Sequence, residues 1–289
     1  MDLPRLYCFC RFFCCLIVAL APIAAGAKSY TAPLRFYGTR PAVEVTVEGQ
    51  GPFLFLIDTG AGGPPARADA LLVKRLGLAM QGRASTSDGG GAPAAIDKLT
   101  LPDVTIGTFS MANVAALSRD YGSIPYLPKL DGILGPAFFK DRLLTIDFVR
   151  GTLTIQDGTL PPADGRNILD YELIEGNLAV PVSIGGQSAK AVIDTGNIRG
   201  LDMPAEAVRP LRMASFPRLA GNSVGVSGSS LIREVTLAAP LRIGGHAIER
   251  PAATFSEDFH EWNIGSALLQ DFVLTIDQKN RRLRLVRAH

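Results

Sequence analysis

The sequence predicts an all-β protein built from two homologous lobes, and three observations lead to this fold class. The first is composition, because 30 Gly and 20 Pro accompany only 7% aromatic residues in a chain of 289, which is typical of many strands joined by tight turns. The second is the alternation of apolar and polar residues in short segments. The third is an internal repeat, which divides most of the chain into two halves with the same motifs in the same order.

Residues 1–27 are predicted to be a secretory signal peptide. Arg5 and Arg11 supply positive charge, an apolar run extends from Phe12 to Ala25, and Ala25-Gly26-Ala27 has the small-x-small form of a cleavage site. The run is shorter than the roughly 20 residues of an ordinary transmembrane helix. We therefore expect the mature chain to begin at Lys28, with an uncleaved membrane anchor as the alternative.

Cysteine usage and net charge exclude several functions. All four cysteines lie in the predicted signal peptide, so the mature chain has no thiol for a disulfide, a nucleophile or a metal site. The net charge of +2 argues against a strongly basic nucleic-acid-binding protein. We expect no metal or other cofactor, because metal-ligand spacing is absent among the three histidines, His246, His260 and His289.

Strands are expected in both halves. Residues 43–47 and 180–184 alternate between apolar and polar side chains, which is the period of a half-buried strand. Residues 53–57 and 191–193 are continuous apolar runs, which are typical of buried strands.

Hairpins and helices complete the expected elements. Residues 143–155 and 273–285 each consist of two apolar segments around a polar turn, which predicts a hairpin in each half. Helical patterns are scarce. The candidates are Arg67–Leu78 and the short stretches after Gly135 and Gly265.

The internal repeat consists of two separate motifs. Gly135–Asp147 aligns without gaps with Gly265–Asp277, and seven of the 13 positions are identical. Upstream, the sequence Leu-Ile-Asp-Thr-Gly at residues 56–60 matches Val-Ile-Asp-Thr-Gly at residues 192–196. The two motifs recur in the same order and at similar spacing, so the chain is predicted to be a duplication.

The predicted boundary between the halves lies near residues 160–165. This segment contains two adjacent prolines and a glycine, a composition that favours a linker. We therefore place the first lobe at residues 28–158 and the second at residues 159–289.

The candidate catalytic residues are Asp58 and Asp194, each in an Asp-Thr-Gly turn. One such turn is weak support for chemistry, because Asp and Gly are common turn residues after a strand. Here each of the two copies follows an apolar strand within a repeated half. Each is also followed, much later, by an apolar residue and a glycine, Leu134-Gly135 and Ile264-Gly265.

These motifs resemble those of the pepsin and retropepsin superfamily of aspartic proteases, most closely the bacterial secreted retropepsin-like aspartyl proteases. The matching elements are Asp58-Thr59-Gly60-Ala61, Asp131-Gly132-Ile133-Leu134-Gly135, Asp194-Thr195-Gly196 and Ile264-Gly265. The resemblance implies an acid-protease fold of two fused retropepsin-like β-barrel lobes with few short helices. It also implies an active site between the lobes, to which each lobe contributes one aspartate.

The chemistry needs this pairing. Two carboxylates about 3 Å apart share one proton, because both cannot ionise readily at that distance. The ionised member can then act as a general base for water and the protonated member as a general acid. Gly60 and Gly196 allow tight turns, and the hydroxyl groups of Thr59 and Thr195 suit a hydrogen-bonded crossover between the loops. In the family, the apolar-Gly strands pass behind these loops, and Gly135 and Gly265 allow that approach.

The resemblance also calls for a flap over the substrate. The candidate is residues 85–91, whose tip is Asp88-Gly89-Gly90-Gly91, with a plain flexible loop as an equal alternative. Residues 223–230 occupy the matching place in the second half. The segment 85–91 contains no tyrosine, although a flap tyrosine is typical of pepsins.

The second half departs from the family pattern at two positions. Asn197 follows the second Asp-Thr-Gly, where Ala, Ser or Thr is usual, and Asn263 stands where a second apolar residue is common. Because an asparagine side chain can hydrogen-bond to a carboxylate, Asn197 is compatible with activity.

Together these features predict a secreted aspartic endopeptidase, a hydrolase of peptide or protein substrates in the bacterial periplasm or outside the cell. We expect a monomer that does not bind nucleic acid and has no stable membrane association once the signal is removed. The alternative is a non-catalytic peptide-binding protein on the same scaffold, which Asn197 and the missing flap tyrosine motivate.

Overall fold

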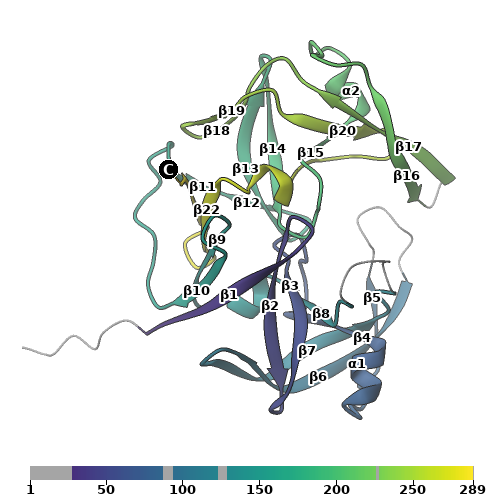
Figure 1. Cartoon of the computed structure of the whole chain (residues 1–289), viewed down its shortest axis with the longest axis vertical. Coiled ribbons are helices and arrows are strands. Elements are labelled where there is room, and N and C mark those ends of the chain that lie inside the picture. Colours follow the sequence, from purple (N-terminus) through teal and green to yellow (C-terminus); the bar gives the residue numbers. More distant parts are fainter. Residues whose placement is uncertain (1–27, 87–93, 123–128, 226–227, 289) are drawn as a thin grey trace, which may run out of the picture.

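The computed structural model describes residues 28–86, 94–122, 129–225 and 228–288 (Figure 1). The predicted signal peptide and the candidate flap tip, Asp88 to Gly91, lie outside the described residues.

The first lobe consists mainly of strands. Its elements are β1 (Ser29–Tyr37), β2 (Arg40–Val47), β3 (Gln50–Ile57), β4 (Ala66–Asp69), α1 (Ala70–Arg75), β5 (Arg83–Thr86), β6 (Ala94–Ile106), β7 (Phe109–Arg119), β8 (Gly132–Leu134), the 3-10 helix η1 (Pro136–Phe139), β9 (Leu143–Asp147) and β10 (Thr152–Gln156).

The second lobe repeats this plan. Its elements are β11 (Ile168–Asp170), β12 (Glu172–Ile174), β13 (Asn177–Ile184), β14 (Gln187–Asp194), β15 (Leu201–Pro204), α2 (Ala205–Val208), β16 (Arg218–Gly225), β17 (Gly228–Thr236), β18 (Leu241–Ile243), β19 (His246–Ile248), β20 (Ala252–Ser256), β21 (Trp262–Gly265), the 3-10 helix η2 (Ser266–Leu268), β22 (Phe272–Asp277) and β23 (Arg282–Arg287).

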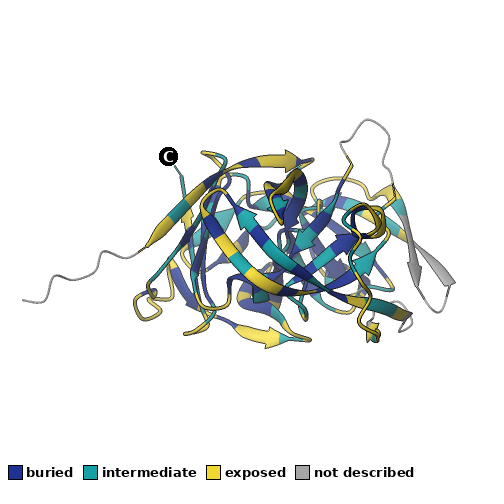
Figure 2. Cartoon of the chain, turned by 90° about the horizontal axis from the view of Figure 1, so that it is seen from below, coloured by how far each residue is buried: buried dark blue, intermediate teal, exposed yellow. Residues whose placement is uncertain are grey.

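The predicted all-β fold class is confirmed. The described strands form one sheet of 13 strands and one of 10, with α1 and α2 as the only α-helices in the described ranges. In Figure 1, β2 to β8 lie below and β13 to β20 lie above, which separates the two lobes. Buried residues run along the central strands, whereas exposed residues gather at outer strands and turns (Figure 2).

Strands from both lobes join in one antiparallel layer, in the order β11-β23-β22-β9-β10-β1. At its centre β9 pairs with β22, and Thr145 lies opposite Thr275 with their hydroxyl oxygens 3.0 Å apart. These two threonines occupy the same position of the internal repeat. Because equivalent residues pair in antiparallel register, the two lobes are related here by a local twofold axis.

The same arrangement positions the Asp-Thr-Gly turn in each lobe. Strand β3 pairs in parallel with β8, and β14 pairs in parallel with β21. In β3 the side chains of Phe53, Phe55 and Ile57 are buried in the core. The aspartate therefore follows a strand that is fixed on both sides, since apolar burial is the main stabilising term in such a core.

Most expected elements are found. Residues 43–47 lie in β2, with the valines buried and Glu44 exposed. The hairpins predicted at 143–155 and 273–285 form as β9–β10 and β22–β23, and the short helical stretches after the two glycines are η1 and η2.

One helix prediction was wrong in its extent. Residues 67–78 were expected to be helical throughout, but residues 66–69 form β4, and α1 covers only Ala70–Arg75. Strand β4 pairs on one side with β7 and on the other with β8. These tertiary contacts override the local helical pattern. The helix begins where the Asp69 side chain accepts a hydrogen bond from the Leu71 N–H.

None of the described helices has the length and apolar character needed to cross a membrane.

Candidate active site

Two buried threonines hold the Asp-Thr-Gly turns together. The Thr59 hydroxyl donates to the carbonyl oxygen of Ile193 at 2.5 Å, and the Thr195 hydroxyl donates to that of Ile57 at 2.5 Å. Each hydroxyl also accepts the backbone N–H of the other threonine at 3.0 Å. This reciprocal cross fixes the two turns against each other around the local twofold axis.

The cross brings Asp58 and Asp194 side by side. The carboxyl group of each aspartate lies against the glycine of the opposite turn, and the two carboxyl groups are close enough for Asp194 to raise the pKa of Asp58. A Cβ atom on Gly60 would collide with the Asp194 carboxyl group, and one on Gly196 would collide with that of Asp58. Glycine is therefore required at both positions by the close approach of the facing carboxylate, in addition to the tight turn.

The apolar-Gly segments lie directly behind the turns. The backbone N–H of Asp58 donates to the carbonyl oxygen of Leu134 at 3.0 Å. Ile264 is in register with Ile193, and Gly265 with Asp194. A Cβ atom on Gly135 would collide with the carbonyl oxygen of Ala61, which explains why glycine follows the apolar residue.

The two carboxylates accept different sets of hydrogen bonds. Oδ1 of Asp58 accepts the Gly60 N–H at 2.9 Å. Oδ1 of Asp194 accepts the N–H groups of Gly196 and Asn197, both at 3.0 Å. Oδ2 of Asp194 also accepts a hydrogen bond from the side-chain amide of Asn263 at 3.0 Å.

Burial raises the pKa of Asp58 to about 7, and repulsion from Asp194 adds to the increase. The positive charge of Arg67 and the Gly60 N–H oppose this increase in pKa without cancelling it. Asp58 can therefore carry a proton at mildly acidic pH, which is what a general acid requires.

Two arginines surround the pair on the first-lobe side. Arg67 donates to the carbonyl oxygens of Ala61 at 3.3 Å and Gly62 at 2.8 Å, so it braces the loop after Asp58. The Arg40 guanidinium stacks 4.7 Å from the centre of the Tyr37 ring. Burial lowers the pKa of Arg40, although its attraction to Tyr37 and to both aspartates works in the opposite direction.

Each Asp-Thr-Gly loop is also held by the other lobe. The Thr39 hydroxyl of the first lobe donates to the carbonyl oxygen of Ile198 at 3.1 Å and lies 2.8 Å from the Ser266 hydroxyl. In return, Oδ1 of Asn177 in the second lobe accepts the Gly62 N–H at 3.2 Å. The relative position of the two aspartates therefore depends on contacts from both halves.

A chain of polar side chains backs the second loop. The Asn197 side-chain amide donates to Asp202 at 2.9 Å and to Oδ1 of Asn263 at 3.0 Å, while its own oxygen accepts the Arg199 N–H at 3.0 Å. Arg199 forms an ion pair with the buried Asp202. The Thr254 hydroxyl also donates to Asp202.

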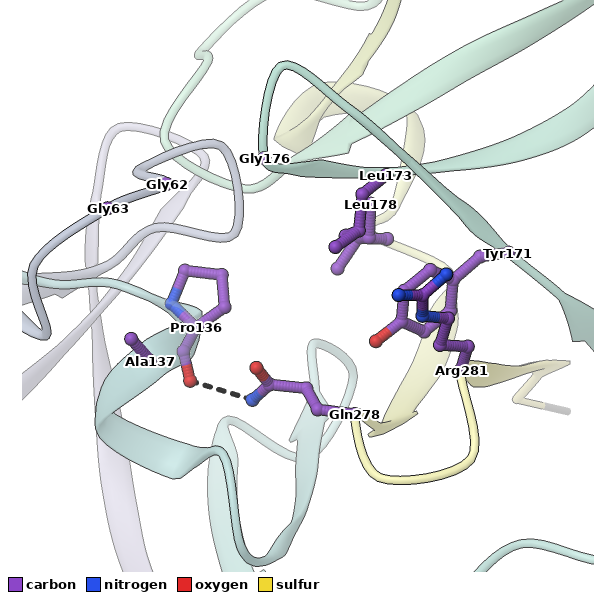
Figure 3. A pocket seen from close by; sticks show the side chains of 10 residues that line it. All are labelled: Gly62, Gly63, Pro136, Ala137, Tyr171, Leu173, Gly176, Leu178, Gln278 and Arg281. Atoms are coloured by element: carbon purple, nitrogen blue, oxygen red, sulfur yellow. Dashed lines mark hydrogen bonds between the residues drawn. The ribbon is translucent and has the colours of Figure 1, made fainter.

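A separate pocket lies between the lobes, beside the loop that follows Asp58 (Figure 3). Its volume is about 230 Å³, and the Gln278 side chain at its floor donates to the carbonyl oxygen of Pro136 at 2.7 Å. Its lining residues are Gly62, Gly63, Pro136, Ala137, Tyr171, Leu173, Gly176, Leu178, Gln278 and Arg281. Neither Asp58 nor Asp194 is among them, so this pocket adjoins the paired carboxylates without containing them.

The structure places each sequence-predicted residue of the two Asp-Thr-Gly loops at this centre. Asp58, Thr59, Gly60 and Ala61 face Asp194, Thr195, Gly196 and Asn197, with Leu134-Gly135 and Ile264-Gly265 behind them. Among the described residues, no group of three or more His, Cys, Asp or Glu side chains is arranged to hold a metal ion.

Sequence reasoning did not find the polar residues behind the second loop. Asn263 was noted only as a departure from an apolar pattern, and Asp202 and Arg199 were not recognised. Arg67, which braces the first loop, was not recognised either. The available signal was an amide at a strand position where the first half has Ile133.

Comparison with known families agrees with this geometry. Residues 43–138 match the model of a family described as aspartyl protease. The match extends from β2 to η1 and includes Asp58, Leu134 and Gly135. It supports an aspartyl protease domain and, in general terms, a protease hydrolase. No curated protein matches the chain.

Proposed function

We propose that the protein is an exported aspartic endopeptidase in which Asp58 and Asp194 activate a water molecule for peptide-bond hydrolysis. The single observation that carries the proposal is that each of the two carboxyl groups lies against the opposite turn, where the Thr59–Thr195 cross holds them close together. The aspartyl protease match to residues 43–138 supports it independently.

In the proposed mechanism the pair supplies both groups that hydrolysis requires. The ionised carboxylate accepts a proton from water as the water oxygen attacks the scissile carbonyl carbon, and the protonated carboxyl group donates its proton to the carbonyl oxygen. The tetrahedral intermediate collapses when the C–N bond breaks. The carboxyl group that took the water proton donates it to the leaving nitrogen, and the other carboxylate takes a proton back from a hydroxyl group of the intermediate. Two protons enter the pair and two leave it in one turnover, so the pair returns to its starting state.

Buried surroundings favour this chemistry. Desolvation keeps one proton on the pair at a pH where a solvent-exposed aspartate would be ionised. The short side chain of Ala61 offers no hydroxyl to stabilise charge on Asp58, so we expect activity to extend above the acidic range of pepsin-like sites.

One chain completes the pair, because each lobe contributes one aspartate and one threonine of the cross. We therefore propose that the monomer is the active form. We also propose that residues 1–27 direct export to the periplasm or the medium, so that the exported chain begins at Lys28. N-terminal mass analysis of exported protein tests this directly, and an intact Met1 end would favour an anchored form.

The decisive experiment incubates residues 28–289 with a diverse peptide library between pH 3 and pH 8 and detects new termini by mass spectrometry. We expect cleavage by the wild type and none by Asp58→Asn or Asp194→Asn. Full activity in a well-folded Asp194→Asn protein would overturn the proposal. Peptide binding by the wild type without cleavage would instead support the non-catalytic alternative, a peptide-binding protein on the same scaffold.

A further inference from the structure

We propose that the chain of side chains behind the second loop holds Asp194 as the ionised member of the pair and leaves the shared proton on Asp58. In this assignment Asn263 is a positioning residue, because it acts on the reaction through Asp194. The inference rests on the proposed function, since it names which carboxylate is the base and which is the acid.

The first argument is the number of donors on each carboxylate. Asp194 accepts three N–H groups, from Gly196, Asn197 and Asn263, and they occupy both of its oxygens. Within the part of the chain that the structure describes, Asp58 accepts one N–H group, at Oδ1. Hydrogen bonds donated to a carboxylate favour its charged form, so the negative charge belongs on Asp194.

The second argument is that the amide of Asn263 has a fixed direction. Asp202 is ion-paired with Arg199 and can only accept, so the NH₂ group of Asn197 must face it. The Arg199 backbone N–H independently fixes the Asn197 oxygen. The NH₂ group of Asn197 therefore also faces Asn263.

The direction then passes to the catalytic carboxylate. Because Asn263 receives a donor from Asn197 at its oxygen, its own NH₂ group must point at Oδ2 of Asp194. A proton on Asp194 would weaken this hydrogen bond, because a neutral carboxyl oxygen is a poorer acceptor than a carboxylate oxygen. The hydrogen bonds that link these side chains therefore all have a fixed direction, from the Arg199–Asp202 ion pair through Asn197 and Asn263 to Asp194.

The third argument is that the first lobe lacks such a chain. Ile133 is in register with Arg67 as Asn263 is with Asp202, and Ala61 stands where the second loop has Asn197. No side-chain amide can therefore reach Asp58 from these positions. The two halves have the same backbone arrangement here, and they differ in the side chains that donate hydrogen bonds to the carboxylate.

Other charged groups around the pair do not reverse this assignment. Arg40 attracts both aspartates, and Asp58 more than Asp194, but burial and repulsion from Asp194 still raise the pKa of Asp58. Arg199 attracts Asp194, and Glu261 repels it. Arg67 attracts Asp58 and so lowers its pKa, but burial and repulsion from Asp194 together raise that pKa by more. Tyr121 lies nearby as a neutral phenol, because burial raises its pKa.

The test replaces Asn263 by the residue that the first lobe uses at the same position, Asn263→Ile. If Asp194 carries the charge in the singly ionised pair, the variant destabilises both that state and the doubly ionised state. Only the acid limb of the kcat/KM profile should then move, upward by about one pH unit, and the alkaline limb should stay in place.

The opposite assignment gives a different result. If the proton resides on Asp194, Asn263→Ile leaves the acid limb unchanged and moves only the alkaline limb, which overturns the proposal. A merely structural role for Asn263 lowers kcat with neither limb displaced, and this also overturns it. Asn197→Ala introduces the side chain that Ala61 has in the first loop. It removes the donor that fixes the orientation of the Asn263 amide, so it should move the acid limb less than Asn263→Ile does.

Two measures keep the test independent of the proposed activity and of folding. Carboxyl titration by NMR of protein labelled with ¹³C at aspartate carboxyls follows the same two midpoints without any substrate. If no peptide is cleaved but Asn263→Ile displaces the lower midpoint, the proposed function fails and the charge assignment stands. Circular dichroism checks folding, and Asn167→Ala, which alters an exposed amide before β11, serves as the matched control with no displacement.

Discussion

The loop after Asp58 and the loop after Asp194 have the same backbone arrangement, but the side chains around them differ. Both follow a buried strand, both carry a threonine of the cross, and both contain a glycine that the facing carboxylate requires. Behind Asp194 lies a chain of amides and an ion pair, whereas Ala61 and Ile133 occupy the matching positions near Asp58. The two halves therefore share the geometry of the pair and differ in the chemical groups around its two members.

The largest expected effect comes from removing either carboxylate. Asp58→Asn and Asp194→Asn should each lower kcat/KM by at least about a thousandfold, because the base and the acid work as one unit. The double variant should be little worse than either single one, which steady-state kinetics on one cleaved peptide can measure. Losses that multiply in the double variant would show that the two aspartates act separately.

The next effect is a pH-dependent gain in stability for Asp58→Asn. Burial, and then repulsion from Asp194, raises the pKa of Asp58 to about 7 from an ordinary 3.8, so the folded protein binds more protons than the unfolded chain between these values. Its stability should therefore fall as the pH rises from about 4 to 7. The asparagine variant lacks this loss, and above pH 7 it should be more stable by up to about 4 kcal/mol.

Urea denaturation at pH 3 and pH 8 measures this difference. The two proteins should have similar free energies of unfolding at pH 3, where Asp58 is protonated in both folded and unfolded chains. A constant difference at both pH values would mean that titration of Asp58 is not its cause.

The threonine cross offers a test of what the loops have in common. Thr59→Val and Thr195→Val are nearly isosteric, and each leaves buried backbone groups without a partner. Each should therefore lower the free energy of unfolding by about 1–3 kcal/mol. Because the cross is reciprocal, the two losses should be similar, and a large difference between them would contradict the symmetry of the cross.

The smallest expected effect concerns Arg67, which pairs with Ile133 as Asp202 pairs with Asn263 in the second half. Its positive charge opposes the increase in the pKa of Asp58, so Arg67→Met should raise that pKa further. The alkaline limb of the kcat/KM profile should move upward, by less than one pH unit because other causes dominate. A downward displacement would contradict this account of Arg67.

Much of the fold could be predicted from the sequence because the same motifs occur in both halves of the chain. The alternation at 43–47 and the paired motifs at 135–147 and 265–277 indicated strands and a duplication, and the structure contains those strands. The extent of α1 could not be predicted, because residues 66–69 are drawn into a sheet by β7 and β8, which are distant in sequence.

The candidate site was only partly predictable for a similar reason. The Asp-Thr-Gly turns and the glycines behind them can be recognised from short local sequence motifs. Asp202 and Arg199 look like ordinary charged residues, because their role depends on the register between β15 and β21. The significance of Asn263 likewise appears only when its neighbours across the sheet are known.

The pairing of β9 with β22 has a consequence for the origin of the chain. An isolated first lobe would present β9 as an open edge, with unpaired backbone donors and acceptors that favour another strand. Since equivalent residues lie opposite each other across this edge, a second copy of the same lobe fits it in an isologous manner. Fusion in one chain supplies β22 at a high effective concentration, and it frees each copy to diverge on its own side of the axis.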